Sequence, residues 1–162
     1  MFLGEYNHSI DAKGRLIVPA KFREELGENF IVTKGLDGCL YIYPDEEWKK
    51  FESKLSELPM GKGDTRKIVR FFLSAATQVE LDKQGRILIP GNHREFAGLE
   101  KDVVFAGVGK KIEIWSKEKW EETATFDYEE MDDVAERMAD LGIEFAPFKK
   151  AAKSKKYENV CI

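Results

Sequence analysis

Two short segments of the chain carry side chains suited to contacting nucleic acid. They read Asp-Ala-Lys-Gly-Arg at residues 11–15 and Asp-Lys-Gln-Gly-Arg at residues 82–86. An arginine can donate two hydrogen bonds to O6 and N7 of guanine, and a lysine can neutralise a phosphate. A two-stranded β-ribbon fits the major groove of DNA. At the tip of such a ribbon, the candidate DNA contacts are Lys13 and Arg15 in the first segment, and Lys83 and Arg86 in the second.

The remaining residues of the two segments are suited to shaping a turn. Gly14 and Gly85 can adopt the positive φ of a tight turn. Asp11 and Asp82 repel phosphate, so we expect them to accept turn amides or to hold the arginine in place. One such segment is also typical of an ordinary hairpin, whose Asp–Arg pair is a surface ion pair worth under ~1 kcal/mol. Two copies with the same spacing favour a DNA role, because a turn alone does not require the arginine.

Both segments belong to a longer internal repeat. Residues 9–27 align with residues 80–98 at an offset of 71, and seven of the 19 positions are identical. Unrelated sequences would match at roughly one position in fifteen to twenty. With one extra loop residue, the match continues at an offset of 72 as far as Trp48 and Trp120. The seven identical pairs are Asp11/Asp82, Gly14/Gly85, Arg15/Arg86, Pro19/Pro90, Arg23/Arg94, Glu24/Glu95 and Gly27/Gly98.

Each copy of the repeat predicts the same order of elements. Two strands flank the turn, and we expect them to pair as a hairpin. Pro19 and Pro90 then begin a short helix, which ends at Gly27 or Gly98. Two more strands complete the copy. The predicted strands are residues 6–10, 15–18, 30–34 and 39–43, and then 77–81, 86–89, 102–106 and 111–115.

Helices are predicted between and after the two copies. Apolar residues recur at helical spacing in three places, which indicates packing faces. A copy of the repeat is too small to bury a competent core alone, so we expect the copies to pack on each other or on other subunits. The fold class is therefore α+β. The three apolar stripes are Trp48, Phe51, Leu55 and Leu58; Ile68, Val69, Phe71 and Phe72; and Met131, Val134, Met138 and Leu141.

The charge of the chain limits how it could bind DNA. Its 162 residues carry a net charge of −4, and residues 144–162 alone contribute +3, so residues 1–143 carry −7. A DNA contact must then lie on a locally basic surface. No apolar run approaches the ~18 residues that span a bilayer, and the N-terminus does not read as a signal peptide. With only two distant cysteines, Cys39 and Cys161, we expect a cytoplasmic protein.

Catalysis has little support in the sequence. The two histidines, His8 and His93, stand at non-equivalent positions of the repeat, and we expect each to be a surface or partly packed side chain. No metal-binding spacing, activated nucleophile or phosphate-binding loop is present. The carboxylates at 121–122 and 127–133 are typical of a solvated helix face. We therefore predict no enzymatic activity and no cofactor.

The segments MFLGEYNHSIDAKGRLIVPAKFR, GLDGCLYIYPDEEW and VELDKQGRILIP resemble the MraZ family over residues 1 to about 143. This resemblance implies two SpoVT-AbrB modules of the swapped-hairpin type in a ring-shaped homo-oligomer. It also implies binding to guanine-rich direct repeats in double-stranded DNA, upstream of the division and cell-wall gene cluster, by a nucleoid-associated protein. By the family pattern Arg15 and Arg86 read DNA with Lys13 beside the first, whereas Gln84 occupies the matching place beside the second.

The expected organisation has five parts. They are a first module at 5–48, a helical linker at 49–76, a second module at 77–120, a C-terminal helix at 121–143 and a tail at 144–162. The tail is either an appended peptide or a natural basic arm that adds phosphate contacts. Besides a DNA-binding regulator, two other functions stay open. One is an antitoxin-like relative that neutralises a protein partner, and the other is a purely structural ring.

Overall fold

The computed structural model describes residues 1–143 and 145, and divides the chain into two compact units. Unit 1 is Met1–Thr123 and contains both copies of the repeat, called here repeat 1 and repeat 2. Unit 2 begins at Ala124, and its described part contains one helix. Apart from Phe145, the tail at 144–162 lies outside the described residues.

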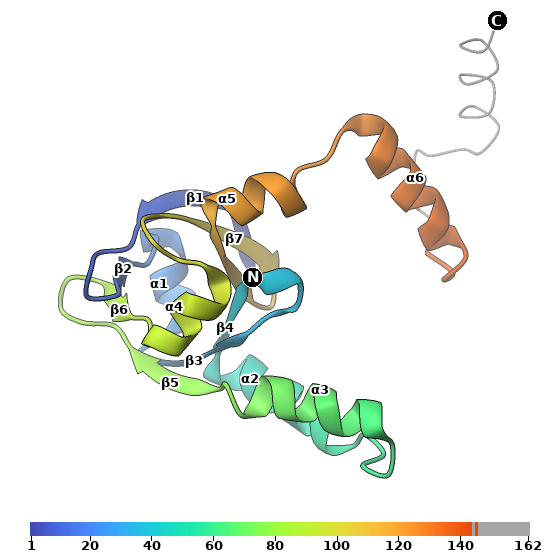
Figure 1. Cartoon of the computed structure of the whole chain (residues 1–162), viewed down its shortest axis with the longest axis horizontal. Coiled ribbons are helices and arrows are strands. Elements are labelled where there is room, and N and C mark those ends of the chain that lie inside the picture. The colour runs from blue at the N-terminus through green and yellow to red at the C-terminus, as the bar shows by residue number, and fades with distance from the viewer. Residues whose placement is uncertain (144, 146–162) are drawn as a thin grey trace, which may run out of the picture. The chain divides into compact units, whose positions relative to one another are not determined.

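Both repeats have the predicted order of elements, strand–strand–helix–strand–strand, so this prediction is confirmed (Figure 1). Pro19 and Pro90 directly precede the helices, and Gly27 and Gly98 follow them with φ of +71° and +67°. Repeat 1 consists of β1 (Phe2–Ser9), β2 (Arg15–Ile17), α1 (Ala20–Leu26), β3 (Asn29–Lys34) and β4 (Leu40–Pro44). Repeat 2 consists of β5 (Thr77–Glu80), β6 (Arg86–Leu88), α4 (Gly91–Ala97), β7 (Asp102–Gly109) and β8 (Ile112–Ser116).

The strands pair between the repeats as well as within them. All pairs are antiparallel, and the main sheet has the order β1-β7-β8-β4-β3-β5. The first strand of each repeat therefore lies against the third strand of the other, β1 on β7 and β5 on β3. If each strand is replaced by its equivalent in the other repeat, the result is the same strand order read from the opposite edge of the sheet. The two repeats are therefore related by an approximate two-fold axis.

The prediction that the first two strands of each repeat pair as a hairpin is wrong. Only an isolated bridge from Ile10 to Leu16 joins the two sides of the first turn, and β2 pairs with β6 as a separate two-stranded sheet. The ribbon beside the turns is thus made by both repeats together. We refer to it below as the β2–β6 ribbon.

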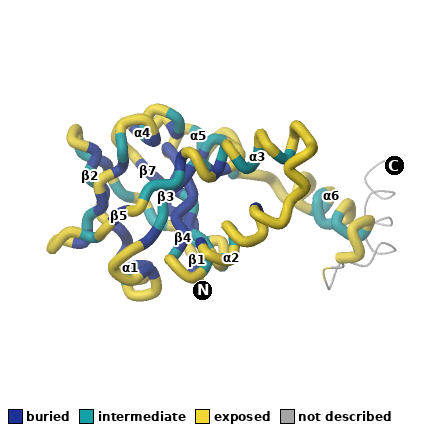
Figure 2. Tube along the Cα trace, turned by 90° about the horizontal axis from the view of Figure 1, so that it is seen from below, coloured by how far each residue is buried: buried dark blue, intermediate teal, exposed yellow. Residues whose placement is uncertain are grey.

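The core of unit 1 lies between the main sheet, the β2–β6 ribbon and the helices α1 and α4. Leu16 and Ile87, which face each other at the centre of the ribbon, are 0% and 1% exposed. Figure 2 shows the central strands of the main sheet in the colour of buried residues, whereas α1 and α4 expose one side. Both repeats contribute to one continuous core that includes Phe22, Phe30 and Phe105.

The linker between the repeats forms two helices, α2 (Asp45–Ser56) and α3 (Gly63–Leu73). Their aromatic side chains stack on the sheet, with Phe51 packed against Tyr43 and Phe72. The fully buried Thr33 of β3 donates a hydrogen bond from Oγ1 to the Phe72 carbonyl at 2.7 Å. Trp48, Leu55 and Phe72 are buried, which confirms packing for these members of the first two apolar stripes. Leu58 of the first stripe is 38% exposed, and Met131 and Leu141 of the third are 37% and 72% exposed, so the prediction of packing is wrong for these three residues.

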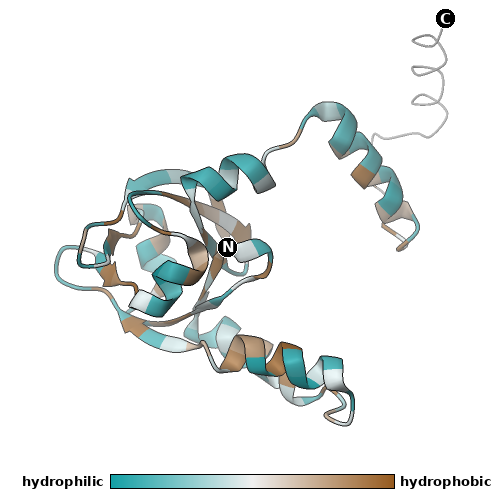
Figure 3. Cartoon of the chain, viewed as in Figure 1, coloured by the Kyte–Doolittle hydropathy of each residue, from teal (hydrophilic) through white to brown (hydrophobic). Residues whose placement is uncertain are grey.

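After β8 the chain continues through α5 (Lys117–Lys119) and a π-helical turn (Trp120–Ala124). In unit 2, Asp127 caps α6 (Tyr128–Ala139) by accepting the Glu130 amide at 2.7 Å. Figure 3 shows α5 and most of α6 as hydrophilic, and the strands inside unit 1 as largely hydrophobic. Among the described residues, no helix has both the length and the apolar character needed to cross a membrane.

Candidate nucleic-acid interface

The first candidate segment is a tight turn organised by Asp11. Its Oδ1 accepts the backbone amides of Lys13 and Arg15 at 3.0 and 2.9 Å, and its Oδ2 accepts Arg15 Nε at 2.6 Å. The backbone closes the turn from the Gly14 amide to the Asp11 carbonyl at 2.9 Å. One carboxylate thus fixes both the turn and the arginine that leaves it.

The second segment repeats this geometry atom for atom. Asp82 Oδ1 accepts the amides of Gln84 and Arg86 at 2.8 and 2.9 Å, and Oδ2 accepts Arg86 Nε at 2.8 Å. The Gly85 amide donates to the Asp82 carbonyl at 3.1 Å. The substitution of Lys13 by Gln84 at the matching position leaves the backbone of the turn the same.

The charged form of each aspartate is favoured by these bonds. The amide of Arg15 lowers the pKa of Asp11 most strongly, and the Arg15 side chain and the Lys13 amide add to it. The pKa of Asp82 is lowered in the same way, first by the Arg86 amide. Since an ionised carboxylate accepts stronger hydrogen bonds than a neutral one, both turns are held firmly near neutral pH.

The structure places the two turns at opposite ends of the β2–β6 ribbon, where each contacts the other repeat. The Val18 amide at the end of β2 donates to the Gly85 carbonyl at 3.0 Å, and the Ile89 amide at the end of β6 donates to the Gly14 carbonyl at 2.8 Å. Each turn is therefore hydrogen-bonded to the strand of the other repeat. In Figure 1 the connections β1–β2 and β5–β6 both lie at the end of unit 1 that carries the β2–β6 ribbon, at the left of the view.

An arginine of the opposite repeat covers each turn glycine. Gly14 and Gly85 are buried with φ of +88° and +76°, and a Cβ built on Gly14 would lie 2.8 Å from Arg94 Nε. A Cβ on Gly85 would lie 2.7 Å from Arg23 Cζ. Arg23 Nε also donates to the Val18 carbonyl at 3.0 Å, whereas Arg94 Nε is buried without a hydrogen-bond partner among the described residues.

Sequence reasoning did not identify Arg23 and Arg94 as part of the site. The available signal was their identity at matching positions of the repeat, on helices that otherwise share few residues. Together with residues 11–15 and 82–86, they form a surface with six basic and two acidic side chains. These residues carry a net charge of +4, although residues 1–143 as a whole carry −7.

The candidate DNA contacts differ in their exposure. Lys13, Lys83 and Gln84 are exposed at the turns. The side chains of Arg15 and Arg86 are 37% and 27% exposed, because each lies against its aspartate and the ribbon. The lysines are free to sample a nearby polyanion, whereas the arginines are held in defined positions.

Other reactive groups of the described chain do not form a catalytic site. His93 is buried at 2% exposure with Nε2 2.6 Å from the Ala75 carbonyl, so the prediction of a surface or partly packed side chain is wrong for this residue. Burial raises the pKa of the Cys39 thiol to about 12, which keeps it protonated. No group of three or more metal-ligating side chains occurs among the residues that the structure describes.

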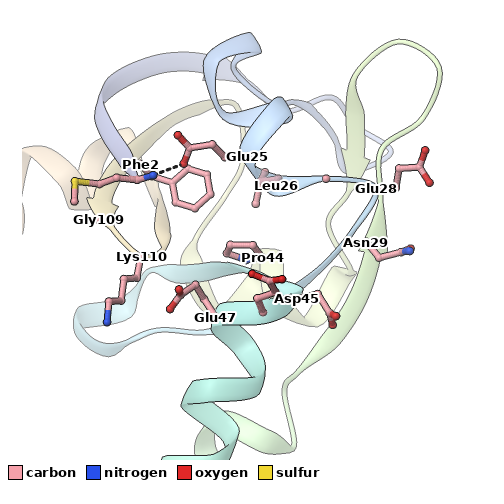
Figure 4. A pocket seen from close by; sticks show the side chains of 13 residues that line it. Phe2, Glu25, Leu26, Glu28, Asn29, Pro44, Asp45, Glu47, Gly109 and Lys110 are labelled. Carbon is pink, nitrogen blue, oxygen red and sulfur yellow. Dashed lines mark hydrogen bonds and ion pairs between the residues drawn. The ribbon is translucent and has the colours of Figure 1, made fainter.

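A pocket of about 750 Å³ lies beside the N-terminus, where the Met1 ammonium group pairs with Glu25 at 2.6 Å (Figure 4). Five acidic side chains and one lysine line it, namely Glu25, Glu28, Asp45, Glu46, Glu47 and Lys110. Such a surface repels a phosphate backbone. None of the turn residues lines this pocket, so it is separate from the candidate interface.

Comparisons with known proteins agree with the internal repeat. A family model described as "MraZ protein, putative antitoxin-like" matches the chain twice, at residues 1–71 and 72–142. A protein of Lachnoclostridium phytofermentans named "Transcriptional regulator MraZ" is 58% identical over 145 residues, covering 90% of this chain and all of the relative. Proteins of the same name from Clostridium tetani and Moorella thermoacetica are 58% and 54% identical, each covering 88% of this chain and all of the relative.

Proposed function

The chain belongs to the MraZ family, and from that premise we propose that it is a transcriptional regulator, not an enzyme, which binds double-stranded DNA through its two paired turns. The proposed contacts are Arg15 and Arg86 to guanine edges, with Lys13, Lys83 and Gln84 beside them. Asp11 and Asp82 position the arginines, and Gly14 and Gly85 allow the turns to form.

One observation carries this proposal. Two turns with the same Asp–Arg geometry flank one two-stranded ribbon, and each is hydrogen-bonded to the strand of the other repeat. An arginine whose Nε is held by a carboxylate has lost much of its conformational freedom before it meets a base. Less entropy is then lost on binding, which favours specific contacts over loose attraction.

Charge supports the same assignment. The two turns, with the arginines that cover them, hold six basic and two acidic side chains, so the negative surplus of residues 1–143 lies on other parts of the chain. Phosphates are attracted to one end and repelled elsewhere, which orients the protein on DNA. A single end of this kind binds weakly, so several subunits must act together to give a useful affinity.

The finer features of the proposal follow the family resemblance. The modules are of the swapped-hairpin type, and subunits form a ring-shaped homo-oligomer in the cytoplasm, associated with the nucleoid. The operator consists of guanine-rich direct repeats upstream of the division and cell-wall gene cluster. The domain boundaries proposed are 5–48 and 77–120 for the two modules, with helices between and after them.

The test is selection of bound duplexes from a random pool by the wild-type protein and by Arg15→Ala. We expect the wild type to enrich guanine-rich repeats and the variant to enrich none. Loss of one bidentate guanine contact costs about 1–3 kcal/mol per subunit, and the loss is multiplied across an oligomer. Arg70→Ala is the matched control, because it removes an exposed arginine from α3 and leaves both turns intact.

Three outcomes separate the candidate functions. Unchanged enrichment by an Arg15→Ala protein of wild-type mass contradicts the assigned site. Co-purification of a small nuclease-like partner, with no enriched duplex, favours the antitoxin-like alternative. An oligomer that enriches no DNA and captures no partner favours a structural ring. Mass is measured by light scattering on the same samples that are used for gel shifts.

A further inference from the structure

The outer face of the β2–β6 ribbon carries two exposed aliphatic side chains. Ile17 and Leu88 are 43% and 58% exposed, whereas their neighbours Leu16 and Ile87 are buried in the core. Side chains alternate between the two faces of a strand. Ile17 therefore faces the same side as Arg15, and Leu88 faces the same side as Arg86.

The strand register places each of these aliphatic residues beside an arginine of the other repeat. Arg15 lies directly opposite Leu88, and Arg86 lies directly opposite Ile17. Residues opposite each other in an antiparallel pair have Cβ atoms about 4.5–5.5 Å apart. The outer face is thus a compact square in which arginine and aliphatic side chains alternate.

This face has a chemical counterpart in the major groove. Guanine offers O6 and N7 to arginine, and the 5-methyl group of thymine is the apolar group that base edges present there. A face of alternating arginine and aliphatic side chains matches a base sequence in which thymine adjoins guanine. We propose that Ile17 and Leu88 determine specificity by packing against thymine 5-methyl groups next to the guanines that Arg15 and Arg86 contact.

The surroundings of the two residues favour DNA over a protein partner. The two arginines lie opposite them on the ribbon, and Lys13 and Lys83 are exposed in the adjoining turns, whereas interface cores between proteins are depleted of lysine. The apolar area is also small, two side chains on a ribbon whose strands are three residues long. The inference rests on the proposed function, because it assigns the bases that the same site reads.

The experiment uses the duplex that the wild-type protein enriches, and copies in which one thymine at a time is replaced by deoxyuridine. This exchange removes the methyl group and leaves every hydrogen-bonding group in place. At the contacted positions we expect Kd to rise about fourfold, as for one buried methylene-sized group. Ile17→Ala should bind the thymine duplex about fourfold more weakly than the wild type does. Replacing the thymine that Ile17 contacts by deoxyuridine should then cause no further rise in the Kd of this variant. Leu88→Ala should behave in the same way at its own position.

Leu3→Ala serves as the control, because Leu3 is an exposed aliphatic residue on β1, outside the ribbon. It should show the full wild-type response to deoxyuridine. Wild-type protein that enriches a duplex but is insensitive to every deoxyuridine exchange overturns this inference alone. Equal deoxyuridine losses in wild type and both variants also overturn it. A change of oligomer mass in Ile17→Ala overturns it by assigning the face to a subunit contact. If the wild type enriches no duplex, the proposed function fails as well.

Discussion

Arg94 of repeat 2 lies directly over Gly14 of repeat 1, so that a Cβ at residue 14 would stand 2.8 Å from Arg94 Nε and 2.9 Å from the Ile89 carbonyl. Arg23 covers Gly85 in the reciprocal arrangement. The shape of each turn therefore depends on side chains from the other repeat. Substitutions at the turns should affect stability in a way that the local sequence alone does not indicate.

Gly14→Ala should lower the free energy of unfolding by about 2–5 kcal/mol. The positive φ costs an L-residue about 1–2 kcal/mol, and forcing a methyl group into the packed contact adds about 1–3 kcal/mol. Gly98→Ala is the control, because Gly98 has the left-handed φ of +67° and a Cβ built on it would meet only the end of the Lys119 side chain, at an ordinary 3.7 Å. It should cost only the backbone part. Urea unfolding of both variants measures the difference, and equal losses would show that the packing under Arg94 is unimportant.

Acid should loosen both turns. The folded pKa of Asp11 and Asp82 lies below the ordinary value of 3.8, so their stabilising contribution is complete above that pH. The contribution is lost as the pH falls through the folded pKa. In the double variant Asp11→Asn, Asp82→Asn, the Tm should fall less steeply than in wild type between about pH 5 and pH 2.5.

Asp64→Asn is the control for the acid experiment, because it removes a carboxylate from α3 and leaves both turns intact. Thermal melting at each pH, followed by circular dichroism, gives the comparison. A double variant that keeps the wild-type dependence of Tm on pH would mean that the Asp–Arg turns add nothing to stability.

Operator binding should require repeats in helical phase. In the proposed oligomer, turns on one face meet successive repeats only where these recur near one DNA turn, about 10–10.5 bp. Inserting about half a turn between two repeats should weaken binding strongly, and inserting a full turn should restore most of it. Gel shifts measure the affinity for the original duplex and for the duplexes with a half-turn and a full-turn insertion. Equal affinities would contradict binding by several turns at once.

A chain ending at Ile143 should fold, assemble and recognise the same operator as the full chain. Both copies of the repeat are complete before this residue, and the omitted segment contributes a charge of +3. Each phosphate contact that its lysines make raises the magnitude of the salt slope by about 0.9, so the shorter chain should show a shallower dependence on salt. Tm, mass by light scattering and affinity at two salt concentrations check this. Failure of the shorter chain to assemble would assign the last residues to the fold.

The elements of the fold could be read from the sequence because each has a local cause. Pro19 and Pro90 begin helices, Gly27 and Gly98 end them, and alternation or helical spacing marks what lies between. The order of elements in both repeats is therefore as predicted. Helix α2 also follows its stripe, beginning at Asp45 and burying Trp48 and Leu55.

The pairing of the strands could not be read in the same way. The repeats resemble each other, so a strand that fits its neighbour within one repeat fits the equivalent strand of the other equally well. Nothing in the residues of β1 distinguishes β3 from β7 as a partner. The pairing of β1 with β7 is decided by contacts between segments far apart in the chain. The same holds for the pairing of β2 with β6, which makes the ribbon a product of both repeats.

The Asp–Arg contact within each turn of the candidate site could be predicted from the sequence. The contacts that hold each turn against the other repeat could not. Asp11 and Arg15 stand four residues apart in one turn, so local spacing sufficed to expect their contact. The cover of Gly14 by Arg94 joins segments 80 positions apart in the chain, and the burial of His93 depends on a carbonyl of the linker. Contacts of this kind have no local pattern, although the identity of Arg23 and Arg94 in the repeat marked them as constrained.

The pairing of strands between repeats also determines when the main sheet can form during synthesis. Ser9 pairs with Asp102, so β1 leaves the ribosome long before any strand exists to complete it. At roughly 5–20 residues per second, the wait is roughly 5–20 s. Throughout that time repeat 1 lacks β7, and for most of it repeat 1 also lacks β6, which forms the ribbon beside its turn. A nascent or truncated chain that stops before β7 consequently has no partner for β1, and only a chain that extends through repeat 2 can complete the sheet.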